Sequence, residues 1–229
     1  MFDAIARRYR LVNAVMTLGL DGRWRRTTIR RLGLAPGTTV LDLASGTGEL
    51  VRVLEAAGHL GVGCDLSFGM LAAGVADTAR AVQADGSALP FADASFDGAT
   101  SGFALRNFTD LDVVLHELAR VVRPGGRLAL LEVDTPDIPG LRQGHALWMR
   151  HVVPRLGALL SDATAYRYLP ASLAYLPSPS SLAERLGSAG FVDVARHRLS
   201  VGVVQVVTAT RLGATPLAAR SHRGETECA

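Results

Sequence analysis

The chain has 229 residues, 48% of them hydrophobic, and this composition excludes intrinsic disorder over most of its length. Its apolar runs are interrupted well before the roughly 18 residues that a transmembrane helix needs, and the N-terminus lacks the apolar segment of a signal peptide. One large cytoplasmic domain is therefore expected. The two cysteines, Cys64 and Cys228, indicate neither a disulfide framework nor a metal site, and a net charge of +3 is too small to indicate nucleic-acid binding by itself.

The first 32 residues are predicted to form two helices, within a helical cap that spans residues 1–35. Five apolar side chains recur there at intervals of three and four residues: Phe2, Ile5, Tyr9, Val12 and Met16. All 24 basic residues of the chain are arginine, and eight of them fall between Arg7 and Arg31. These arginines are interpreted as a solvated helix face, with contact to an anionic membrane surface as the alternative.

Residues 36–134 alternate short apolar runs with helical stretches, which is typical of βαβ units around a parallel sheet. Strands are predicted at 38–43, 59–66, 79–85, 96–103 and 126–134. A helix is predicted at 111–122 from the spacing of its apolar residues, and the proline and glycines of the following RPGG are expected to end it. This region is the predicted α/β core.

The remainder of the chain has a different character. Residues 135–190 contain several prolines between short helical stretches, and they are predicted to be a helical insertion that covers the substrate. Residues 191–200 and 201–210 are predicted to form an antiparallel strand pair, within a C-terminal hairpin that spans 191–212. The tail at 213–229 is predicted to be disordered.

A glycine-rich loop follows the first predicted strand, in the sequence VLDLASGTGEL. Gly46 and Gly48 let a ligand approach the backbone, while Val51 stands where a dinucleotide fingerprint needs a third glycine. Asp65 and Asp85 end the next two strands, so three candidate ligand-binding segments meet at the carboxyl edge of one sheet. Asp65 suits the hydroxyls of a ribose and Asp85 an adenine amino group. The alternative for each acid is a turn or a helix cap.

Several motifs together resemble the class I S-adenosylmethionine-dependent methyltransferases, namely DLASGTG, GCDLS, ADGSALPFADASFD and ELARVVRPGGRL. Three more resemble the C-methyltransferase family of menaquinone and ubiquinone biosynthesis, namely MFDAIARRYRLVNAVMTLGLDGRWRR, FALRNF and AYRYLPASLAYLPSP. The resemblance implies a Rossmann-like α/β fold with a seven-stranded, mostly parallel sheet whose last strand is antiparallel. It also implies S-adenosyl-L-methionine as cofactor, S-adenosyl-L-homocysteine as product, and a ring carbon of a reduced quinone as methyl acceptor.

The same resemblance implies roles for individual residues. Those expected around the cofactor are Asp42, Gly46, Thr47, Gly48, Asp65, Leu66, Met70, Asp85, Gly86 and Gly102. Those expected in catalysis are Arg106, Asn107 and Tyr9. Those expected to contact the substrate are Asn13, Phe103, Tyr166 and Tyr168. No metal is expected.

Arg106 and Asn107 lie just beyond the fourth predicted strand, at the edge where the cofactor is expected. A ring carbon becomes nucleophilic when the neighbouring phenol loses its proton, so the site needs a base or a group that stabilises a phenolate. Arginine stays protonated and is a poor base. Arg106 is therefore predicted to stabilise the developing phenolate, while Asn107 orients it. The alternative is that Arg106 pairs with an acid such as Asp110 and caps the next helix.

Two departures from the family pattern keep other functions open. Arg10 replaces the acid of the usual Y-D-x-x-N pattern, and the C-terminal strand reads VVQVVTATRL. The leading hypothesis is C-methylation of demethylmenaquinol. The alternatives are methylation of another phenolic or polyketide ring, and a non-catalytic cofactor-binding partner. A lipid quinol or phenol is the expected small-molecule partner and nucleic acid is not, while peripheral membrane contact through the arginine-rich N-terminus and a homodimer are further expectations.

Overall fold

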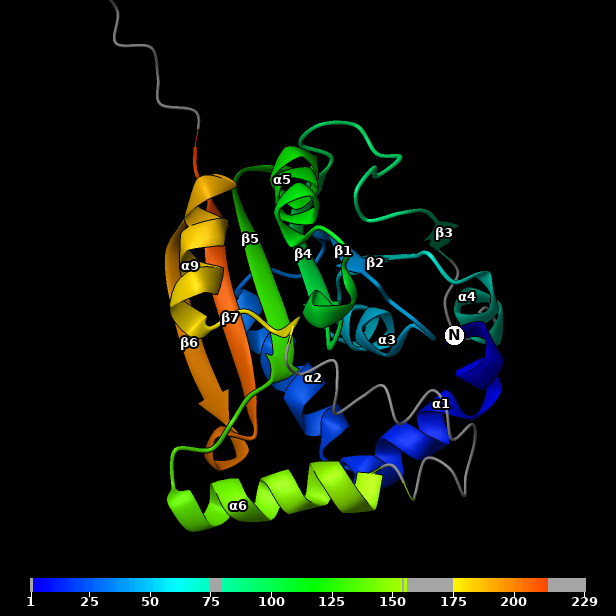
Figure 1. Cartoon of the computed structure of the whole chain (residues 1–229). Coiled ribbons are helices and arrows are strands. Elements are labelled where there is room, and N and C mark those ends of the chain that lie inside the picture. Colours follow the sequence, from blue (N-terminus) through cyan, green and yellow to red (C-terminus); the bar gives the residue numbers. More distant parts are fainter. Residues whose placement is uncertain (1, 75–79, 154, 156–174, 214–229) are drawn as a thin grey trace, which may run out of the picture.

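A seven-stranded sheet with helices on both faces forms the body of the molecule in the computed structural model, which describes residues 2–74, 80–153, 155 and 175–213 (Figure 1). The strand order is β3-β2-β1-β4-β5-β7-β6. Strand β7 runs antiparallel to both its neighbours, whereas the other neighbouring strands pair in parallel. The predicted sheet is confirmed.

The strands are β1 (Thr39–Leu43), β2 (Leu60–Asp65), β3 (Ala81–Gln83), β4 (Phe96–Gly102), β5 (Val122–Val133), β6 (Phe191–Leu199) and β7 (Val204–Arg211). After β1 the chain moves outward to β2 and β3, then returns to place β4 on the other side of β1. The strand order therefore reverses between β1 and β4. In open α/β sheets, ligands bind outside the carboxyl ends of the strands at such a reversal.

The helices are α1 (Phe2–Met16), α2 (Asp21–Leu32), α3 (Glu49–Ala56), α4 (Phe68–Gly74), α5 (Leu111–Val121), α6 (Pro139–Leu147) and α9 (Pro179–Ser188), with the short turns η1 (Leu105–Asn107), η2 (Trp148–Val152) and η4 (Ser200–Gly202). Helices α2 and α3 cover one face of the sheet, and α5 and α9 cover the other (Figure 1). On the strands, alternate side chains join opposite cores: Val40 packs with α2 and α3, while Leu41 and Leu43 pack with α5. Burial on both faces explains the continuous apolar runs in the sequence.

Strand β5 begins earlier than predicted, because the RPGG sequence does not form a separate loop. Val122 pairs with Phe96 and Arg127 with Gly98, so the residues between them are accommodated in a bulge of β5. Gly126 lies in this bulge close to β4, where a Cβ would be 2.7 Å from the carbonyl oxygen of Asp97. The glycine therefore permits the strand to continue through the bulge.

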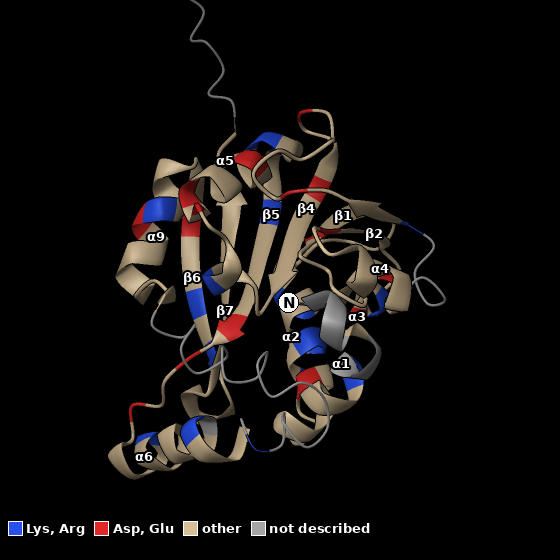
Figure 2. Ribbon diagram, turned by 45° about the vertical axis from the view of Figure 1, so that its right-hand side comes forward, with Lys and Arg blue, Asp and Glu red and all other residues tan. Residues whose placement is uncertain are grey.

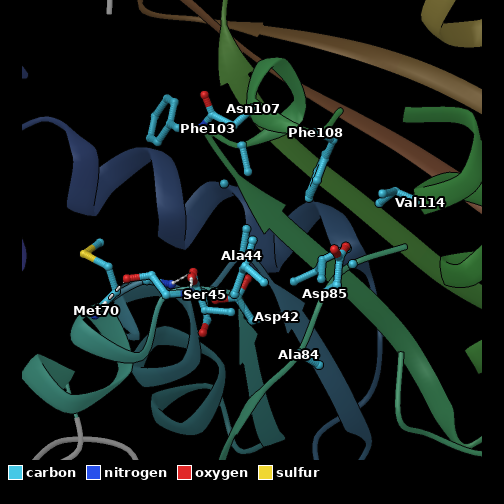
Figure 3. A pocket seen from close by; sticks show the side chains of 18 of the residues that line it. Asp42, Ala44, Ser45, Met70, Ala84, Asp85, Phe103, Asn107, Phe108 and Val114 are labelled. Atoms are coloured by element: carbon cyan, nitrogen blue, oxygen red, sulfur yellow. Dashed lines mark hydrogen bonds between the residues drawn. The ribbon is translucent and has the colours of Figure 1, made fainter. Parts of the chain in front are cut away.

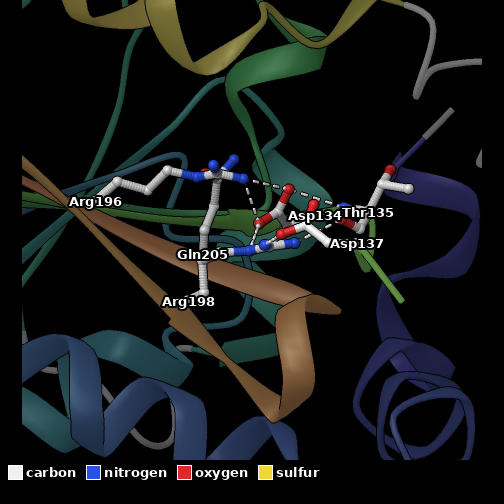
Figure 4. Close-up of polar contacts among 6 residues, drawn as sticks. All are labelled: Asp134, Thr135, Asp137, Arg196, Arg198 and Gln205. Atoms are coloured by element: carbon white, nitrogen blue, oxygen red, sulfur yellow. Dashed lines mark hydrogen bonds and ion pairs between the residues drawn. The ribbon is translucent and has the colours of Figure 1, made fainter. Parts of the chain in front are cut away.

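Ion pairs join the end of β5 to the C-terminal hairpin (Figure 4). Arg196 Nη2 donates to both carboxylate oxygens of Asp134, at 2.7 and 2.6 Å. Arg198 also pairs with Asp134, at 3.2 Å, and with Asp137. The predicted reversal of this hairpin occurs at η4, where three consecutive residues, Ser200, Val201 and Gly202, have positive φ angles. The ion pairs of Asp134 and Asp137 with the two arginines fix the chain where it leaves the sheet after β5.

The insertion predicted at 135–190 contains elements of two kinds. Helix α6 has no buried residues and lies apart from the sheet (Figure 1). Helix α9 instead packs on the sheet beside α5, since Leu182 and Leu186 lie in the same hydrophobic core as the buried residues of α5. Most of the intervening segment, and the tail from residue 214, lie outside the described residues. In the described residues, no helix is both long and apolar enough to cross a membrane.

Candidate active site

A pocket of about 700 Å³ opens at the carboxyl ends of β1, β2 and β4, where the strand order reverses (Figure 3). Its charged lining residues are Arg25, Asp42, Glu49, Asp65, Asp85 and Asp110. Five of these six side chains are acidic. The pocket therefore suits a ligand that is positively charged or rich in hydrogen-bond donors.

The glycine-rich loop after β1 forms the floor of this pocket, and Asp65 holds it in place. The backbone N–H of Gly46 donates to Asp65 Oδ2 at 2.7 Å, and the N–H of Ser67 donates to Oδ1 at 2.8 Å. The side chain of Met70 covers the loop, because a Cβ on Gly46 would lie 3.1 Å from Met70 Cε. Asp65 thus stands at the end of β2 in a fixed orientation, facing the pocket.

Asp42, at the end of β1, is the most deeply buried acid of the pocket. It is 1% exposed, and Thr100 Oγ1 donates to its Oδ1 at 2.9 Å. Burial raises the pKa of Asp42 from its ordinary 3.8 to about 7, since a buried carboxylate loses its hydration. The hydrogen bond from Thr100 and the charge of Arg25 oppose this rise, while Glu49 and Asp65 add to it. A cation placed beside Asp42 would favour its ionised form.

Two strained backbone positions face the pocket at the reversal point. Ala44 follows β1 with φ of 56°, and Phe103 follows β4 with φ of 59°, although neither is glycine. Such conformations cost on the order of 1–3 kcal/mol and are concentrated at functional sites. At Phe103 the turn places the ring at the wall of the pocket, in edge contact with Trp24 and beneath the guanidinium of Arg25.

The far wall of the pocket is less polar and comes from η1 and α5. Phe108, Val113 and Val114 line it together with Asn107 (Figure 3). The alternative pairing of Arg106 with Asp110 is wrong: the side chain of Asp110 caps α5 by accepting the N–H groups of Asp112 and Val113, and Arg106 pairs with Glu132. An amide at the edge of an apolar wall could orient an aromatic ring through one of its oxygens.

Arg106 lies on the other side of η1. It is 8% exposed and its Nη1 forms an ion pair with Glu132, which also accepts the backbone N–H of Leu105 at 3.1 Å and of Val133 at 2.9 Å. Burial raises the pKa of Glu132, and the charge of Arg106 and the two N–H donors oppose that rise. Arg106 does not line the 700 Å³ pocket but borders a second hollow of about 490 Å³, together with Asn107 and Tyr175.

The pocket brings together most of the residues predicted from the sequence. The predicted cofactor residues that line it are Asp42, Gly46, Asp65, Leu66, Met70, Asp85, Gly86 and Gly102. Thr47 and Gly48 are not among the lining residues: the Thr47 hydroxyl donates to Glu49 at 2.7 Å, and Gly48 precedes α3. Of the other predicted site residues, Asn107 and Phe103 line the pocket.

The other predicted site residues are Asn13, Tyr9, Tyr166 and Tyr168. Asn13 donates to Asp21 at 3.0 Å and so joins α1 to α2. Of Tyr9 only the backbone is described, and Tyr166 and Tyr168 lie outside the described residues. The predictions for these three tyrosines therefore stay predictions.

Sequence reasoning missed Arg25, which is buried in the pocket wall rather than on a solvated face. The signal was its spacing, since Arg25, Ile29 and Leu32 fall on one face of α2 and all three are buried. Glu49 was also missed. It lies at the first position of α3, where the helix dipole favours a carboxylate, and it pairs with Arg10 at 3.5 Å and Arg52 at 2.8 Å.

Known proteins are similar to this chain over most of its length. The model of the ubiE/COQ5 methyltransferase family matches residues 1–211. The chain belongs to this family. A demethylmenaquinone methyltransferase of Corynebacterium kroppenstedtii is 43% identical over 212 residues, which are 92% of this chain and 93% of that protein. One from Mycolicibacterium paratuberculosis is 42% identical over 92% of each chain. The prediction of an S-adenosylmethionine-dependent methyltransferase is confirmed.

Solved structures of other methyltransferases share the fold of this ubiE/COQ5 family member. A chain from the complex between the Haloferax volcanii Trm112 methyltransferase activator and a putative methyltransferase has a TM-score of 0.66 at 20% identity, covering 92% of this chain and 97% of that one. Phosphoethanolamine N-methyltransferase 2 of Haemonchus contortus, in complex with S-adenosyl-L-methionine, has a TM-score of 0.60 at 16% identity, covering 82% and 52%. These similarities confirm the Rossmann-like methyltransferase fold.

The lining residues fit the methyl donor of such an enzyme. S-adenosylmethionine carries a ribose diol, an adenine amino group, an α-ammonium group and a sulfonium, and each of these is a cation or a hydrogen-bond donor. The acids at the strand ends are acceptors, and they outnumber the cations among the described lining residues. The cofactor also carries one carboxylate, and Arg25 supplies a buried cation in the same wall.

Proposed function

We propose that this protein transfers a methyl group from S-adenosylmethionine to a ring carbon of demethylmenaquinol. The observation that carries the proposal is the 43% identity, over 92% of the chain, to a relative named demethylmenaquinone methyltransferase. The confirmed fold and the acidic pocket support the cofactor, and the apolar far wall supports an aromatic acceptor.

The strand ends supply one acceptor group for each part of the cofactor. We assign Asp85 to the adenine, Asp65 to the ribose, and Asp42 with Gly102 to the methionine end, following the order of β3, β2, β1 and β4 across the sheet. When bound, the cofactor supplies an electrophilic methyl group on its sulfonium. The protein's part is to hold the acceptor carbon in line with that methyl group and to exclude water.

The acceptor ring is proposed to lie against Phe103 and Phe108, which line the pocket from the two sides of η1. Aromatic rings stack on one another favourably, at about 0.5–1.5 kcal/mol beyond the area that they bury. We assign the amide of Asn107 to the ring oxygen next to the acceptor carbon. A hydrogen bond from this amide stabilises the phenolate form, which is the nucleophilic one.

Arg106 is proposed to support this step through its ion pair with Glu132. The pair, together with the N–H of Leu105 on the same carboxylate, ties η1 to β5 and so fixes the position of Asn107. Because Arg106 does not line the pocket and its charge is paired with Glu132, we assign it the positioning of Asn107. Tyr9 remains a predicted contributor from the cap.

Peripheral membrane contact is proposed as the way in which the enzyme reaches a lipid quinol. Helix α2 carries exposed arginines, among them Arg23, Arg26 and Arg30, and the turn before it exposes Leu18 and Leu20. Figure 2 shows basic residues, in blue, on α2. Basic side chains near an anionic surface contribute about 1 kcal/mol each. Sedimentation with vesicles that contain anionic lipid should retain the protein, and high salt should release it. A homodimer remains an expectation that sedimentation velocity would test.

The decisive experiment is an assay of the purified protein with S-adenosylmethionine and a short-chain demethylmenaquinol, with the product identified by mass spectrometry. Ring methylation is expected, and Asn107→Ala should lower kcat by about 100-fold, since it removes one donor to a developing oxyanion. Thermal unfolding of the variant serves as the folding control. If calorimetry detects cofactor binding but the quinol is not methylated, the acceptor is wrong, and other phenols become the substrates to test.

A further inference from the structure

Arg25 is a buried cation without a full set of partners. Its side chain comes from α2, is 6% exposed and lines the pocket. Within the described part of the chain, its Nε has no hydrogen-bond partner. The nearest acid is Asp21, whose Oδ2 lies 3.5 Å from Nε, close enough for an ion pair and too poorly placed for a hydrogen bond. An arginine buried in this way normally forms several hydrogen bonds, so its surroundings are incomplete without a ligand.

The side chain is nevertheless held in one place. Asp21 Oδ2, which faces Arg25, also accepts a hydrogen bond from Asn13 Nδ2 at 3.0 Å, so α1 fixes the acid that orients the guanidinium. On the other side, the guanidinium carbon lies 5.8 Å from the centre of the Phe103 ring. A cation over an aromatic face is stabilised without losing its hydrogen-bond donors. Arg25 is therefore positioned, with donors left for a ligand.

Its position within the pocket indicates which part of the ligand it meets. A Cβ built on Gly102, the last residue of β4, would lie 3.7 Å from Arg25 Nη1. Arg25 also acts on the ionisation of Asp42, at the end of β1. Neighbouring strands are about 4.8 Å apart, so the ribose site at β2 lies about 10 Å across the sheet edge from β4. Arg25 thus lies at the methionine end of the proposed cofactor site.

We propose that Arg25 binds the α-carboxylate of the cofactor's methionine moiety, and that Asp21 and Asn13 are its positioning residues. Among the described residues of the pocket wall, Arg25 is the single cation beside five acids, and the carboxylate is the one anionic group of S-adenosylmethionine. The planar guanidinium suits a carboxylate, which it can bind through two parallel hydrogen bonds. This inference rests on the cofactor orientation given under the proposed function.

The test is a comparison of S-adenosylmethionine with decarboxylated S-adenosylmethionine, which lacks only that carboxylate, by isothermal titration calorimetry. The wild-type protein should bind the decarboxylated compound about 10- to 100-fold more weakly, which is the usual effect of losing a charged hydrogen-bond partner. Arg25→Gln should weaken binding of S-adenosylmethionine by a similar factor, and leave binding of the decarboxylated compound within about twofold of wild type. Arg26→Gln, an exposed neighbour on the same helix, should leave both affinities unchanged.

Several results would overturn the proposal. Equal affinity of the wild-type protein for the two compounds, which needs no variant, would show that no cation binds the carboxylate. An equal loss of both affinities in Arg25→Gln would show a structural role only. If Arg25→Gln bound both compounds as wild type does but had a lower kcat, Arg25 would be assigned to the acceptor oxygen instead. If the wild-type protein binds neither compound, the proposed cofactor site itself is wrong. Arg25→Lys keeps the charge but loses the paired geometry, and should fall between wild type and Arg25→Gln.

Discussion

Cofactor binding is expected to release a proton from Asp42. In the empty pocket burial raises the pKa of this carboxyl to about 7, so about half of the molecules hold the proton at pH 7. The proposed site places the cationic end of the cofactor beside Asp42. An opposite charge within about 4–6 Å lowers the pKa of a carboxyl by about 1–3 units, which leaves Asp42 ionised in the complex at neutral pH.

The size of the effect follows from these two ionisation states. If the cofactor lowers the pKa of Asp42 by about 1–3 units, binding should release about 0.4–0.9 proton from this carboxyl at pH 6, about 0.4–0.5 at pH 7 and about 0.1 at pH 8. The cofactor's own α-amino group, with an ordinary pKa near 8, takes up protons in part of the same range. Asp42→Asn keeps that uptake and removes the release, so the difference between the two proteins isolates Asp42.

The assay is calorimetry of S-adenosylhomocysteine binding at each pH, in two buffers with different ionisation enthalpies. The slope of the observed enthalpy against the buffer enthalpy gives the number of protons exchanged. We expect the wild-type slope to differ from that of Asp42→Asn by about half a proton at pH 7, and by less at pH 8. Identical slopes in the two proteins would refute the reasoning, because they would mean that Asp42 has the same charge with and without the cofactor.

The same carboxyl makes the empty protein less stable as the pH rises. Its folded pKa of about 7 lies above the unfolded value near 3.8, so between these values the folded state holds a proton that the unfolded state has lost. Between these two pKa values the free energy of unfolding should therefore fall by up to about 1.4 kcal/mol per pH unit as the pH rises, about 4 kcal/mol in total. It should level off above the folded pKa of about 7. Urea unfolding of wild type and Asp42→Asn at pH 5 and pH 8 measures this difference. If the extra stability of Asp42→Asn over wild type did not grow from pH 5 to pH 8, the prediction would be wrong.

Two further predictions concern the supports of the pocket. Gly74→Ala should destabilise the protein by about 1–3 kcal/mol and weaken cofactor binding, because the new Cβ would lie 2.6 Å from the carbonyl oxygen of Thr47 in the glycine-rich loop. Gly187→Ala is the matched control, since its Cβ would meet no atom of the described residues within 4 Å, and it should stabilise α9 by about 0.8–1 kcal/mol. Thermal and urea unfolding compare the two variants. Glu132→Gln should lower the free energy of unfolding by about 3–5 kcal/mol, because it leaves the charge of Arg106 buried without its acid. Urea unfolding should show a smaller loss for the double variant Glu132→Gln with Arg106→Met, which would confirm that the two side chains are coupled.

The fold could be predicted from the sequence because its strands are buried on both faces. The run TVLDL, in β1, buries apolar side chains on both faces of the sheet, Val40 on one and Leu41 and Leu43 on the other. The least accurate boundary was that of β5, which begins at Val122 rather than Gly126. A proline and two glycines usually interrupt a strand, and only the pairing with β4 shows that a bulge accommodates them.

The cofactor residues at the strand ends could be predicted for a similar reason. Asp65 and Asp85 follow strands whose carboxyl ends meet at one edge, so their proximity follows from the topology. Thr47 lies next to residues that line the pocket, yet it does not line the pocket itself, and its hydroxyl donates to Glu49. The sequence identifies the segment that forms such a loop, whereas the direction of each side chain depends on the φ and ψ angles of two or three glycines.

The arginines show why the pairing of charged side chains at the site could not be predicted from the sequence. Their long side chains reach partners that are distant in the sequence, as Arg106 reaches Glu132, so sequence position does not determine the partner. One signal was present, because Glu132 directly follows the apolar run at residues 128–131 of β5, and a buried acid requires a cation or several donors.

Arg25 and Arg106 differ in how completely the protein pairs their charges and hydrogen-bond donors. This difference indicates that the two arginines have different roles. The acid paired with Arg106 is also held by two backbone N–H groups, so that pair is a finished structural unit beneath η1. Arg25 has an acid at ion-pair distance and an aromatic ring, and one of its donors has no partner among the residues that the structure describes. Burial of an incompletely paired charge costs stability, and a protein retains such a charge where a ligand completes it. The cofactor's carboxylate is the group in this pocket whose charge and geometry would do so.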